Sequence, residues 1–188
     1  MSLPGSEVEP VAPDDSVFEL ERVRDLVRAV PDYPEPGVLF RDLTPVLADA
    51  EAFATLTTEL AACVGAADVV AGVEARGFLI GAAVALVAGT GIVPVRKAGK
   101  LPVVAGSRTY DLEYGTATLE LPGGVVEPGT RVFLVDDVLA TGGTAAAACA
   151  LLTEAGAEVV GFGTVVELVA LGGRARLGDL PVHALLRY

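Results

Sequence analysis

The chain has 188 residues, 52% of them hydrophobic and 20% charged, so it can bury a sizeable core and is too apolar for a disordered protein. The formal net charge of −12 at pH 7 argues against nucleic acid or an anionic membrane as the main partner. Any anion would therefore have to bind at a local cluster of cations.

Residues 1–15 are rich in proline and acidic side chains, and we expect a flexible tail there. They lack the basic and apolar segments of a secretory signal. A capping box, Ser16 with Glu19, and apolar residues at helical spacing predict a helix over 16–30. "PDYPEPG" should end that helix, "VLFRDLTPVL" should be short and irregular, and a second helix is expected over roughly Ala50 to Val64.

From residue 68 onward, apolar runs typical of buried strands alternate with helical patterns. Residues 78–95 carry no charge and are nearly long enough to span a bilayer, but Gly89, Gly91 and Pro94 interrupt them. They read better as a buried helix, a turn and a buried strand. Strands are expected at 68–73, 91–97, 131–137, 157–168 and 182–188, helices at 78–88, 144–155 and 173–177, a long loop at 98–115, and an edge or hairpin strand at 116–121.

This alternation predicts one α/β domain over residues 16–188, with a mostly parallel, doubly wound sheet flanked by helices. In such sheets ligands bind at the carboxyl ends of the strands. The turns at 74–77, 97–113 and 136–144 are therefore where a site is expected.

Cysteine and histidine offer little chemistry. Cys63 and Cys149 fit small buried thiols in a reducing cytosol better than a disulfide or a nucleophile. His183 lies in an apolar terminal strand and is interpreted as structural. With one histidine and no Cys-x-x-Cys, a zinc site is not expected.

The stretch "VFLVDDVLATGGT" (132–144) combines two kinds of binding group. Backbone N–H groups of a glycine turn at a helix N-terminus can bind one phosphate, assisted by threonine hydroxyls. Carboxylates at the end of the strand suit vicinal hydroxyls, or Mg²⁺ through water. Together they predict a ribose 5-phosphate site, and the alternative is an ordinary glycine turn beside a solvated acid pair. The candidate residues are Asp136, Asp137, Ala140, Thr141, Gly142, Gly143 and Thr144.

This stretch resembles the signature of the type I phosphoribosyltransferases, which bind 5-phosphoribosyl 1-pyrophosphate. In order, "PDYPEPGVLFRDLTPVL", "AGVEARGFLIG", "VPVRKAGKLP", "TYDLEYG" and "VVELVALGGR" narrow the resemblance to the adenine-specific family, over residue 17 to the end. The resemblance implies the type I fold with a small hood and a flexible lid loop. It also implies a cytoplasmic homodimer of purine salvage that converts adenine and phosphoribosyl pyrophosphate to AMP and pyrophosphate, with Mg²⁺ carried by the substrate.

Further residue roles are also implied by the resemblance. Pyrophosphate should contact the "EARG" turn through Glu74, Ala75 and Arg76, with a non-proline cis peptide near Glu74–Ala75. Both lysines of this acidic chain fall within "RKAGK", so Lys97, and less firmly Arg96 and Lys100, are candidates for pyrophosphate contact; the alternative is a solvated charge cluster. The base should lie against Leu39, Phe40 and Arg41.

Glu113 is the candidate catalytic residue. Adenine N9 can attack the sugar only when the imidazole ring loses a proton, which a carboxylate at N7 can accept. The loop at about 98–113 should close as a lid that excludes water, with closing contacts from Arg108, Tyr110 and Tyr114.

Two alternatives stay open. A xanthine or 6-oxopurine phosphoribosyltransferase generally places a lysine after the signature loop, and this chain has no lysine after Lys100. A regulator that senses phosphoribosyl pyrophosphate without turning it over usually adds a DNA-binding module or a basic RNA-binding face. The acidic chain offers neither.

Overall fold

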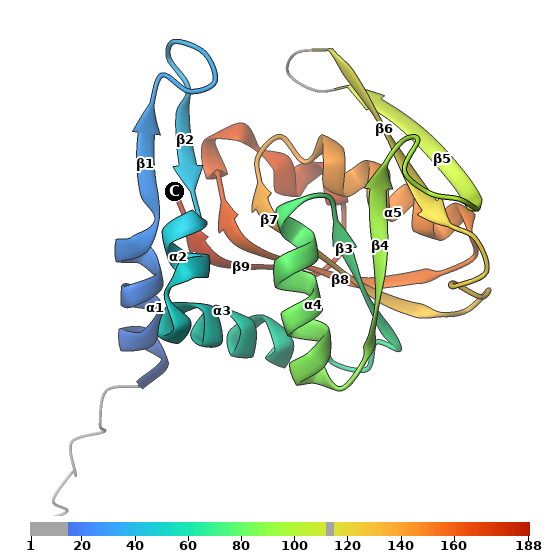
Figure 1. The fold of residues 1–188 in the computed structure, drawn as a ribbon, viewed down its shortest axis with the longest axis horizontal. Helices are drawn as coiled ribbons and strands as arrows, with labels where there is room; N and C mark the ends of the chain where they lie inside the picture. The colour runs from blue at the N-terminus through green and yellow to red at the C-terminus, as the bar shows by residue number, and fades with distance from the viewer. Residues whose placement is uncertain (1–14, 112–114) are drawn as a thin grey trace, which may run out of the picture.

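The computed structural model describes residues 15–111 and 115–188, and its centre is a seven-stranded sheet in the order β5-β6-β4-β3-β7-β8-β9 (Figure 1). The parallel strands β3, β4, β7, β8 and β9 form most of the sheet, and the antiparallel β6 and β5 extend it beyond β4. This confirms the predicted mixed α/β class. The strands are β3 (Val69–Val73), β4 (Gly91–Lys97), β5 (Val104–Asp111), β6 (Thr116–Pro122), β7 (Arg131–Leu139), β8 (Glu158–Glu167) and β9 (Val182–Arg187).

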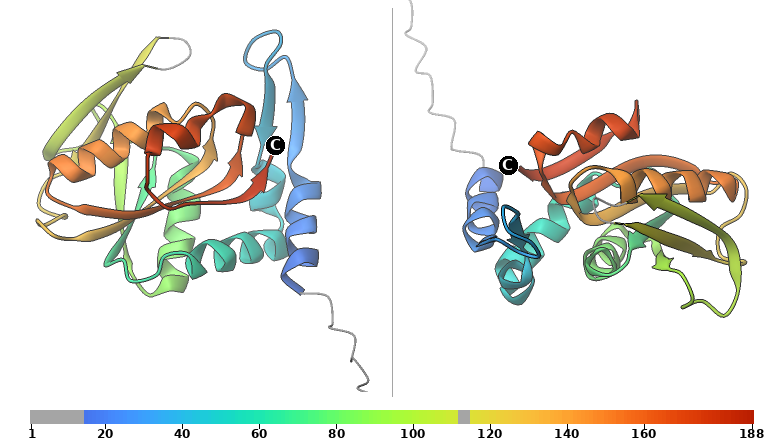
Figure 2. Two further views of the ribbon diagram at one scale, coloured as in Figure 1. Left: turned by 180° about the vertical axis from the view of Figure 1, so that it is seen from behind. Right: turned by 90° about the horizontal axis from the view of Figure 1, so that it is seen from above.

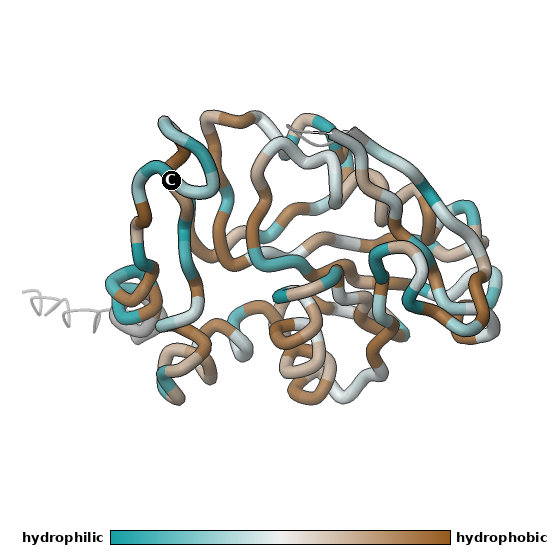
Figure 3. Tube along the Cα trace, turned by 45° about the horizontal axis from the view of Figure 1, so that its top comes forward, coloured by the Kyte–Doolittle hydropathy of each residue, from teal (hydrophilic) through white to brown (hydrophobic). Residues whose placement is uncertain are grey.

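Alternation along the central strand β7 divides the core into two clusters. Phe133 and Val135 face one side, where they pack with residues of α1 (Asp15–Leu26), α2 (Thr44–Ala48), α3 (Ala50–Ala62) and α4 (Arg76–Ala88). Val132 and Leu134 face the other side, against α5 (Gly143–Glu154). Figure 2 shows these helices on opposite sides of the sheet. In Figure 3 the helices along the lower side of the view are mainly brown and white, as expected for the apolar α3 and α4.

The hood is a two-stranded antiparallel ribbon formed by β1 (Arg28–Pro31) and β2 (Leu39–Asp42). The helix predicted over 16–30 is therefore wrong at its end, because α1 stops at Leu26. "VLFRDLTPVL" is also more regular than expected, since it forms β2 and α2. Helical spacing of the apolar residues could not reveal this pairing, which joins Val30 to Phe40 across a turn.

The long loop predicted at 98–115 is also wrong over residues 104–111. Residues 104–111 form β5, which pairs with β6 in the register Ser107↔Glu120 and Thr109↔Thr118. The two threonine hydroxyls of the second pair lie 2.8 Å apart. Consequently β5, not β6, forms the edge of the sheet (Figure 1). The sequence of β5 contains no apolar run that would predict a strand. The strand forms because it pairs with β6.

Other expectations have mixed outcomes. The helices at 50–64, 78–88, 144–155 and 173–177 are confirmed with small shifts of their ends. The predicted tail lies almost entirely outside the described residues. Within the described part of the chain, no helix is long and apolar enough to cross a membrane. Both cysteines are free thiols, and burial raises the pKa of Cys149 to about 11, as expected of an unreactive thiol.

Candidate active site

A cavity of about 530 Å³ lies where the hood meets the carboxyl ends of the central strands. It brings together most of the predicted site residues, which come from turns far apart in the sequence. The lining residues are Val38, Leu39, Phe40, Arg41, Glu74, Ala75, Arg76, Lys97, Tyr110, Ala117, Asp136, Asp137, Val138, Ala140, Thr144, Leu168 and Leu171. The expectation that the strand-end turns meet at one site is therefore confirmed, whereas the individual roles stay predictions.

The loop 140–144 joins β7 to α5 and lines a second, small cavity of about 60 Å³. Gly142 is the residue before the helix and has φ +79°, a conformation that suits glycine. No side chain caps the start of this twelve-residue helix, so the N–H groups of its first turn are available to an anion. The Thr144 hydroxyl donates to the Tyr110 hydroxyl at 3.2 Å, which ties the loop to β5.

Asp136 and Asp137 lie in the second half of β7, and only 8% and 7% of their surfaces are exposed. The alternative of a solvated acid pair is therefore wrong. Burial, reinforced by the neighbouring Asp137 charge, raises the pKa of Asp136 well above its usual range. The backbone N–H of Asp137 donates to Asp136 Oδ1 at 2.9 Å.

Asp137 has an oxygen that the described residues leave unsatisfied. Arg76 Nε lies 2.7 Å from Asp137 Oδ2, but the two are not aligned as a hydrogen bond, and this buried oxygen has no other partner. A buried carboxylate oxygen beside a cavity is available to a ligand hydroxyl or to a hydrated cation.

We expect Asp136→Asn to raise the Tm at neutral and alkaline pH. A carboxyl whose folded pKa is raised contributes its stabilisation at low pH and loses it as the pH rises through the folded pKa. The isosteric amide carries no charge, so its advantage should shrink as the pH falls below the raised pKa of Asp136. Calorimetric Tm values across a pH series measure this difference.

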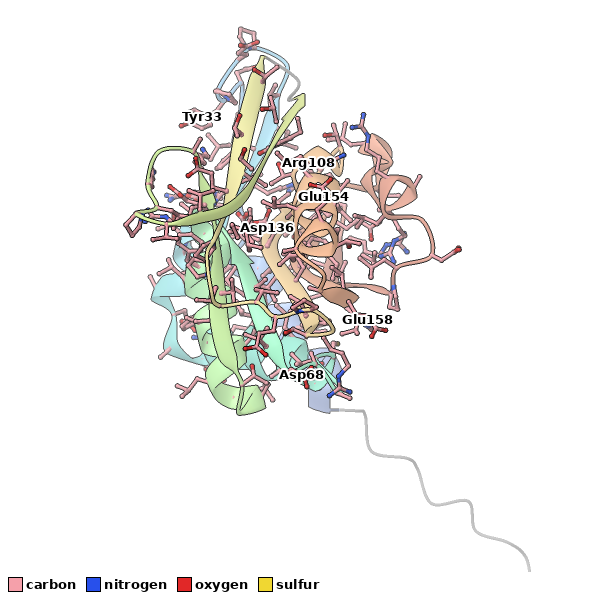
Figure 4. The ribbon with its side chains drawn as sticks, turned by 90° about the vertical axis from the view of Figure 1, so that its right-hand side faces the viewer. Tyr33, Asp68, Arg108, Asp136, Glu154 and Glu158 are labelled. Carbon is pink, nitrogen blue, oxygen red and sulfur yellow. The ribbon has the colours of Figure 1, made fainter. Side chains whose placement is uncertain are left out.

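Asp68→Asn is the matched control. Hydrogen bonds from Arg131 hold the pKa of Asp68 at about 2, so this carboxylate stabilises the fold at neutral pH and its loss should lower the Tm. In Figure 4 Asp68 lies at the opposite end of the sheet from Asp136. An Asp136→Asn variant that is less stable than wild type at every pH would contradict the expectation.

Glu74 engages part of the predicted cation cluster. Its side chain, 8% exposed, accepts hydrogen bonds from Arg96 Nε at 3.3 Å, from the Lys97 backbone N–H at 3.0 Å, and from the Lys100 ammonium. Burial raises the pKa of Glu74, but these hydrogen bonds outweigh burial and hold it below its usual range. Arg96 and Lys100 therefore pair with Glu74 and do not line the cavity, whereas Lys97 does.

The hood positions aromatic and cationic groups at the cavity. The Arg76 guanidinium lies 5.2 Å from the centroid of the Phe40 ring, and the Arg41 guanidinium lies 4.0 Å from that of Tyr188. A cis peptide bond joins Glu74 to Ala75, as the resemblance implied. Phe40, Arg41 and Arg76, which line this part of the cavity, thus come from β2 and from the start of α4.

Some predicted residues do not join the cavity, and some lining residues were missed. Glu113 and Tyr114 lie outside the described residues, and Arg108 pairs with Glu154 of α5. Five lining residues not predicted from the sequence are Val38, Ala117, Val138, Leu168 and Leu171. Val138 directly follows the acid pair, so its place in the signature could have indicated it, whereas no local signal marks the two leucines.

Comparisons with known proteins agree with this geometry. A model of the phosphoribosyl transferase domain matches residues 47–177. The adenine phosphoribosyltransferase of Kineococcus radiotolerans is 61% identical over 90% of this chain and 95% of its own, and that of Saccharopolyspora erythraea is 57% identical over 92% and 94%. The crystal structure of the Rhodothermus marinus adenine phosphoribosyltransferase has a TM-score of 0.86 at 44% identity and covers 92% of this chain and 99% of its own. The Saccharomyces cerevisiae enzyme, solved with an imino-altritol bisphosphate and adenine, has a TM-score of 0.86 at 36% identity over 90% and 99%.

Proposed function

Because the chain belongs to the phosphoribosyltransferase family, we infer that it is an adenine phosphoribosyltransferase, which converts adenine and phosphoribosyl pyrophosphate to AMP and pyrophosphate. The observation that carries this inference is the cavity where the buried acid pair and the turn 140–144, the proposed phosphate-binding turn, meet the hood. We propose that the enzyme works in purine salvage in the cytoplasm.

The sugar donor fits the β7 end of the cavity. The 5-phosphate would lie on the N–H groups of the turn 140–144, with the Thr141 and Thr144 hydroxyls beside it. The ribose 2′- and 3′-hydroxyls would donate to Asp136 and Asp137, where Asp137 Oδ2 lacks a partner among the described residues. Burial raises the pKa of Asp136, and carboxyls perturbed in this way gather at ligand sites.

The leaving pyrophosphate needs cations and backbone donors. Lys97 and Arg76 line the cavity and can neutralise the charge that develops as the C1–oxygen bond breaks. Arg96 and Lys100 donate hydrogen bonds to Glu74. They can therefore contact pyrophosphate only if they give up these hydrogen bonds. The contact first predicted for all three cations therefore rests mainly on Lys97.

We propose that Mg²⁺ enters this site bound to phosphoribosyl pyrophosphate. No cluster of three or more candidate ligands occurs in residues 15–111 and 115–188, whereas Asp137 Oδ2, which accepts no hydrogen bond from the described residues, could hold a hydrated ion through water. When bound, Mg²⁺ would neutralise charge on the pyrophosphate and the leaving group.

Adenine fits between the hood and the β7 end. Phe40 and Leu39 offer apolar contact from one side and Val138 and Leu168 from the other, while the backbone around Arg41 can read the purine edge. Glu113 is proposed to take the N7 proton as N9 attacks C1. Water must be excluded meanwhile, because it would hydrolyse the activated sugar.

Pyrophosphate release tests the inference against the regulator alternative. We expect release from phosphoribosyl pyrophosphate and Mg²⁺ only when adenine is added, with AMP formed in equal amount. Tight binding of phosphoribosyl pyrophosphate without any AMP would support a sensor instead.

We propose that the enzyme is a homodimer that associates through α4. The outward face of this helix carries Leu79, Leu86 and Val87 with 58%, 82% and 56% of their surfaces exposed, beside Ile92 of β4. Apolar patches of this kind mark protein interfaces. A second copy of the chain is the partner that the family implies.

We expect Leu86→Glu to convert the dimer to a monomer in sedimentation velocity, because a charge in an apolar interface is desolvated without a partner. Val125→Glu is the control, since Val125 is 52% exposed on the turn between β6 and β7. A wild-type monomer, or a Leu86→Glu variant that stays dimeric, would refute the proposed interface.

A further inference from the structure

The segment 168–177 contacts both halves of the proposed site. Leu168 and Leu171 line the main cavity. Gly173 lies directly against the phosphate-binding turn: a Cβ added there would meet the Ala140 carbonyl oxygen at 2.2 Å, and a Cβ added to Gly142 would meet the Gly173 carbonyl oxygen at 2.4 Å. The position of this segment therefore determines two things: where Leu168 and Leu171 form the base-side wall of the cavity, and where the phosphate-binding turn lies.

Little regular structure holds this segment in place. It consists of two short 3-10 turns, Val169–Leu171 and Gly173–Leu177. Its backbone is tied at one end, where Leu168 N donates to Leu139 O at 2.9 Å and Val169 N to Tyr188 O at 2.8 Å. At the other end Leu177 packs into the core beside α5, and the part between, which touches the phosphate-binding turn, has a polar anchor of its own.

Arg174 supplies that anchor. Its Nε donates to Glu167 Oε1 at 3.0 Å, its Nη2 to Glu167 Oε2 at 2.6 Å, and its Nη1 to the Val182 carbonyl oxygen at 2.8 Å. The guanidinium thus joins the end of β8, the start of β9 and the residue next to Gly173. Arginine has the planar fork that this geometry requires, and lysine does not.

Glu167 is a suitable fixed point for the anchor. It belongs to β8, its side chain is 5% exposed, and Arg187 of β9 adds a further hydrogen bond to Oε2 at 3.1 Å. Glu167 is buried although Arg174 is 41% exposed, so removal of Arg174 leaves a buried carboxylate with Arg187 as its remaining cationic partner. The Glu167 carboxylate would then draw in water or move, and the segment would lose its alignment.

We propose that Arg174, held by Glu167, is a positioning residue that fixes the phosphate-binding turn and the base-side wall relative to each other. It touches neither substrate, so its loss acts through binding of both rather than through proton transfer. This inference rests on the proposed function, because it assumes that the phosphate and the base occupy these two subsites.

Arg174→Met tests the proposal, because it keeps the length and apolar stem of the side chain and removes every donor. We expect the KM values for phosphoribosyl pyrophosphate and for adenine each to rise about tenfold or more, with a smaller change in kcat, since small displacements of binding groups cost this much. Arg174→Lys should fall between Arg174→Met and wild type. All kinetics are measured well below the Tm of each variant.

Arg131→Met is the matched control. Arg131 makes a similar fork with Asp68, with bonds of 3.2 and 2.7 Å, at the far end of β7 (Figure 4, where Asp68 is labelled). Its loss should lower the Tm and leave both KM values near wild type. Unchanged KM values in Arg174→Met, or equal increases in Arg131→Met, would overturn the proposal.

Gly173→Ala keeps the test decisive if Arg174→Met does not fold. The added methyl must displace the turn at Ala140, so the KM for phosphoribosyl pyrophosphate should rise; an unchanged value would show that the segment does not position the turn. A wild-type protein that makes no AMP would refute the proposed function alone. The Kd of Mg²⁺–phosphoribosyl pyrophosphate, measured by calorimetry for wild type and for Arg174→Met, would then still test the positioning role.

Discussion

Glu113→Ala is expected to lower kcat by about 10²–10⁴-fold, the usual contribution of one general acid–base group. Glu113 lies outside the described residues, but both flanks of its segment reach the cavity. Tyr110 at the end of β5 and Ala117 near the start of β6 line it and pair with each other in the ribbon. The described residues that flank Glu113 therefore lie at the cavity.

The other acids at the cavity are already engaged. Glu74 accepts hydrogen bonds from three residues, and Asp136 and Asp137 lie at the sugar side. No histidine lines the cavity among the described residues. A carboxylate from the β5–β6 connection is thus the remaining candidate for a base that reaches N7.

Steady-state kinetics and a pH profile measure this effect. Glu113→Gln should lose activity as Glu113→Ala does, because an amide cannot accept the proton. Glu158→Gln is the control, since this exposed carboxylate lies at the opposite end of the sheet (Figure 4). A kcat that is unchanged in Glu113→Ala would remove this residue from the mechanism.

Gly142→Ala is expected to raise the KM for phosphoribosyl pyrophosphate by about 100-fold, because misplacement of a binding group by about 1 Å has costs of this size. Two separate effects act on the turn. Its φ of +79° is unfavourable for alanine, and the new methyl would approach the Gly173 carbonyl oxygen to 2.4 Å. The turn must move, and with it the N–H groups proposed to hold the 5-phosphate.

Gly89→Ala separates conformational strain from loss of the site. Gly89 has a similar φ of +72° at the end of α4, and a Cβ there would meet nothing within 4 Å. It should lose stability and keep its KM. If Gly142→Ala binds phosphoribosyl pyrophosphate as tightly as wild type, the turn is not the phosphate site.

Local sequence patterns were sufficient for the parallel core and for the acid pair and glycine turn at the end of β7. Apolar runs marked β3, β4, β7 and β8, and the change from apolar strand to acid pair to glycine turn marked residues 136–144. These features are encoded within a dozen residues each. Strand-end topology then brought them to one edge of the sheet.

Features that depend on distant pairing were not predictable in this way. The sequences of β1 and β5 show no alternation of apolar and polar residues. These strands form because they pair with β2 and β6. Likewise, "RKAGK" showed a cation cluster but not that Glu74 would engage Arg96 and Lys100. Leu168 and Leu171 reach the cavity because backbone hydrogen bonds tie their segment to Leu139 and Tyr188, and no local pattern encodes these distant contacts.

A panel of purine bases tests the central claim most directly. The kcat/KM with phosphoribosyl pyrophosphate and Mg²⁺ is measured for adenine, hypoxanthine, guanine and xanthine, and nucleotide formation is followed for each. We predict efficient formation of AMP from adenine and little or no product from the three 6-oxopurines. Equal or better use of hypoxanthine, guanine or xanthine would contradict the assignment of this chain to adenine.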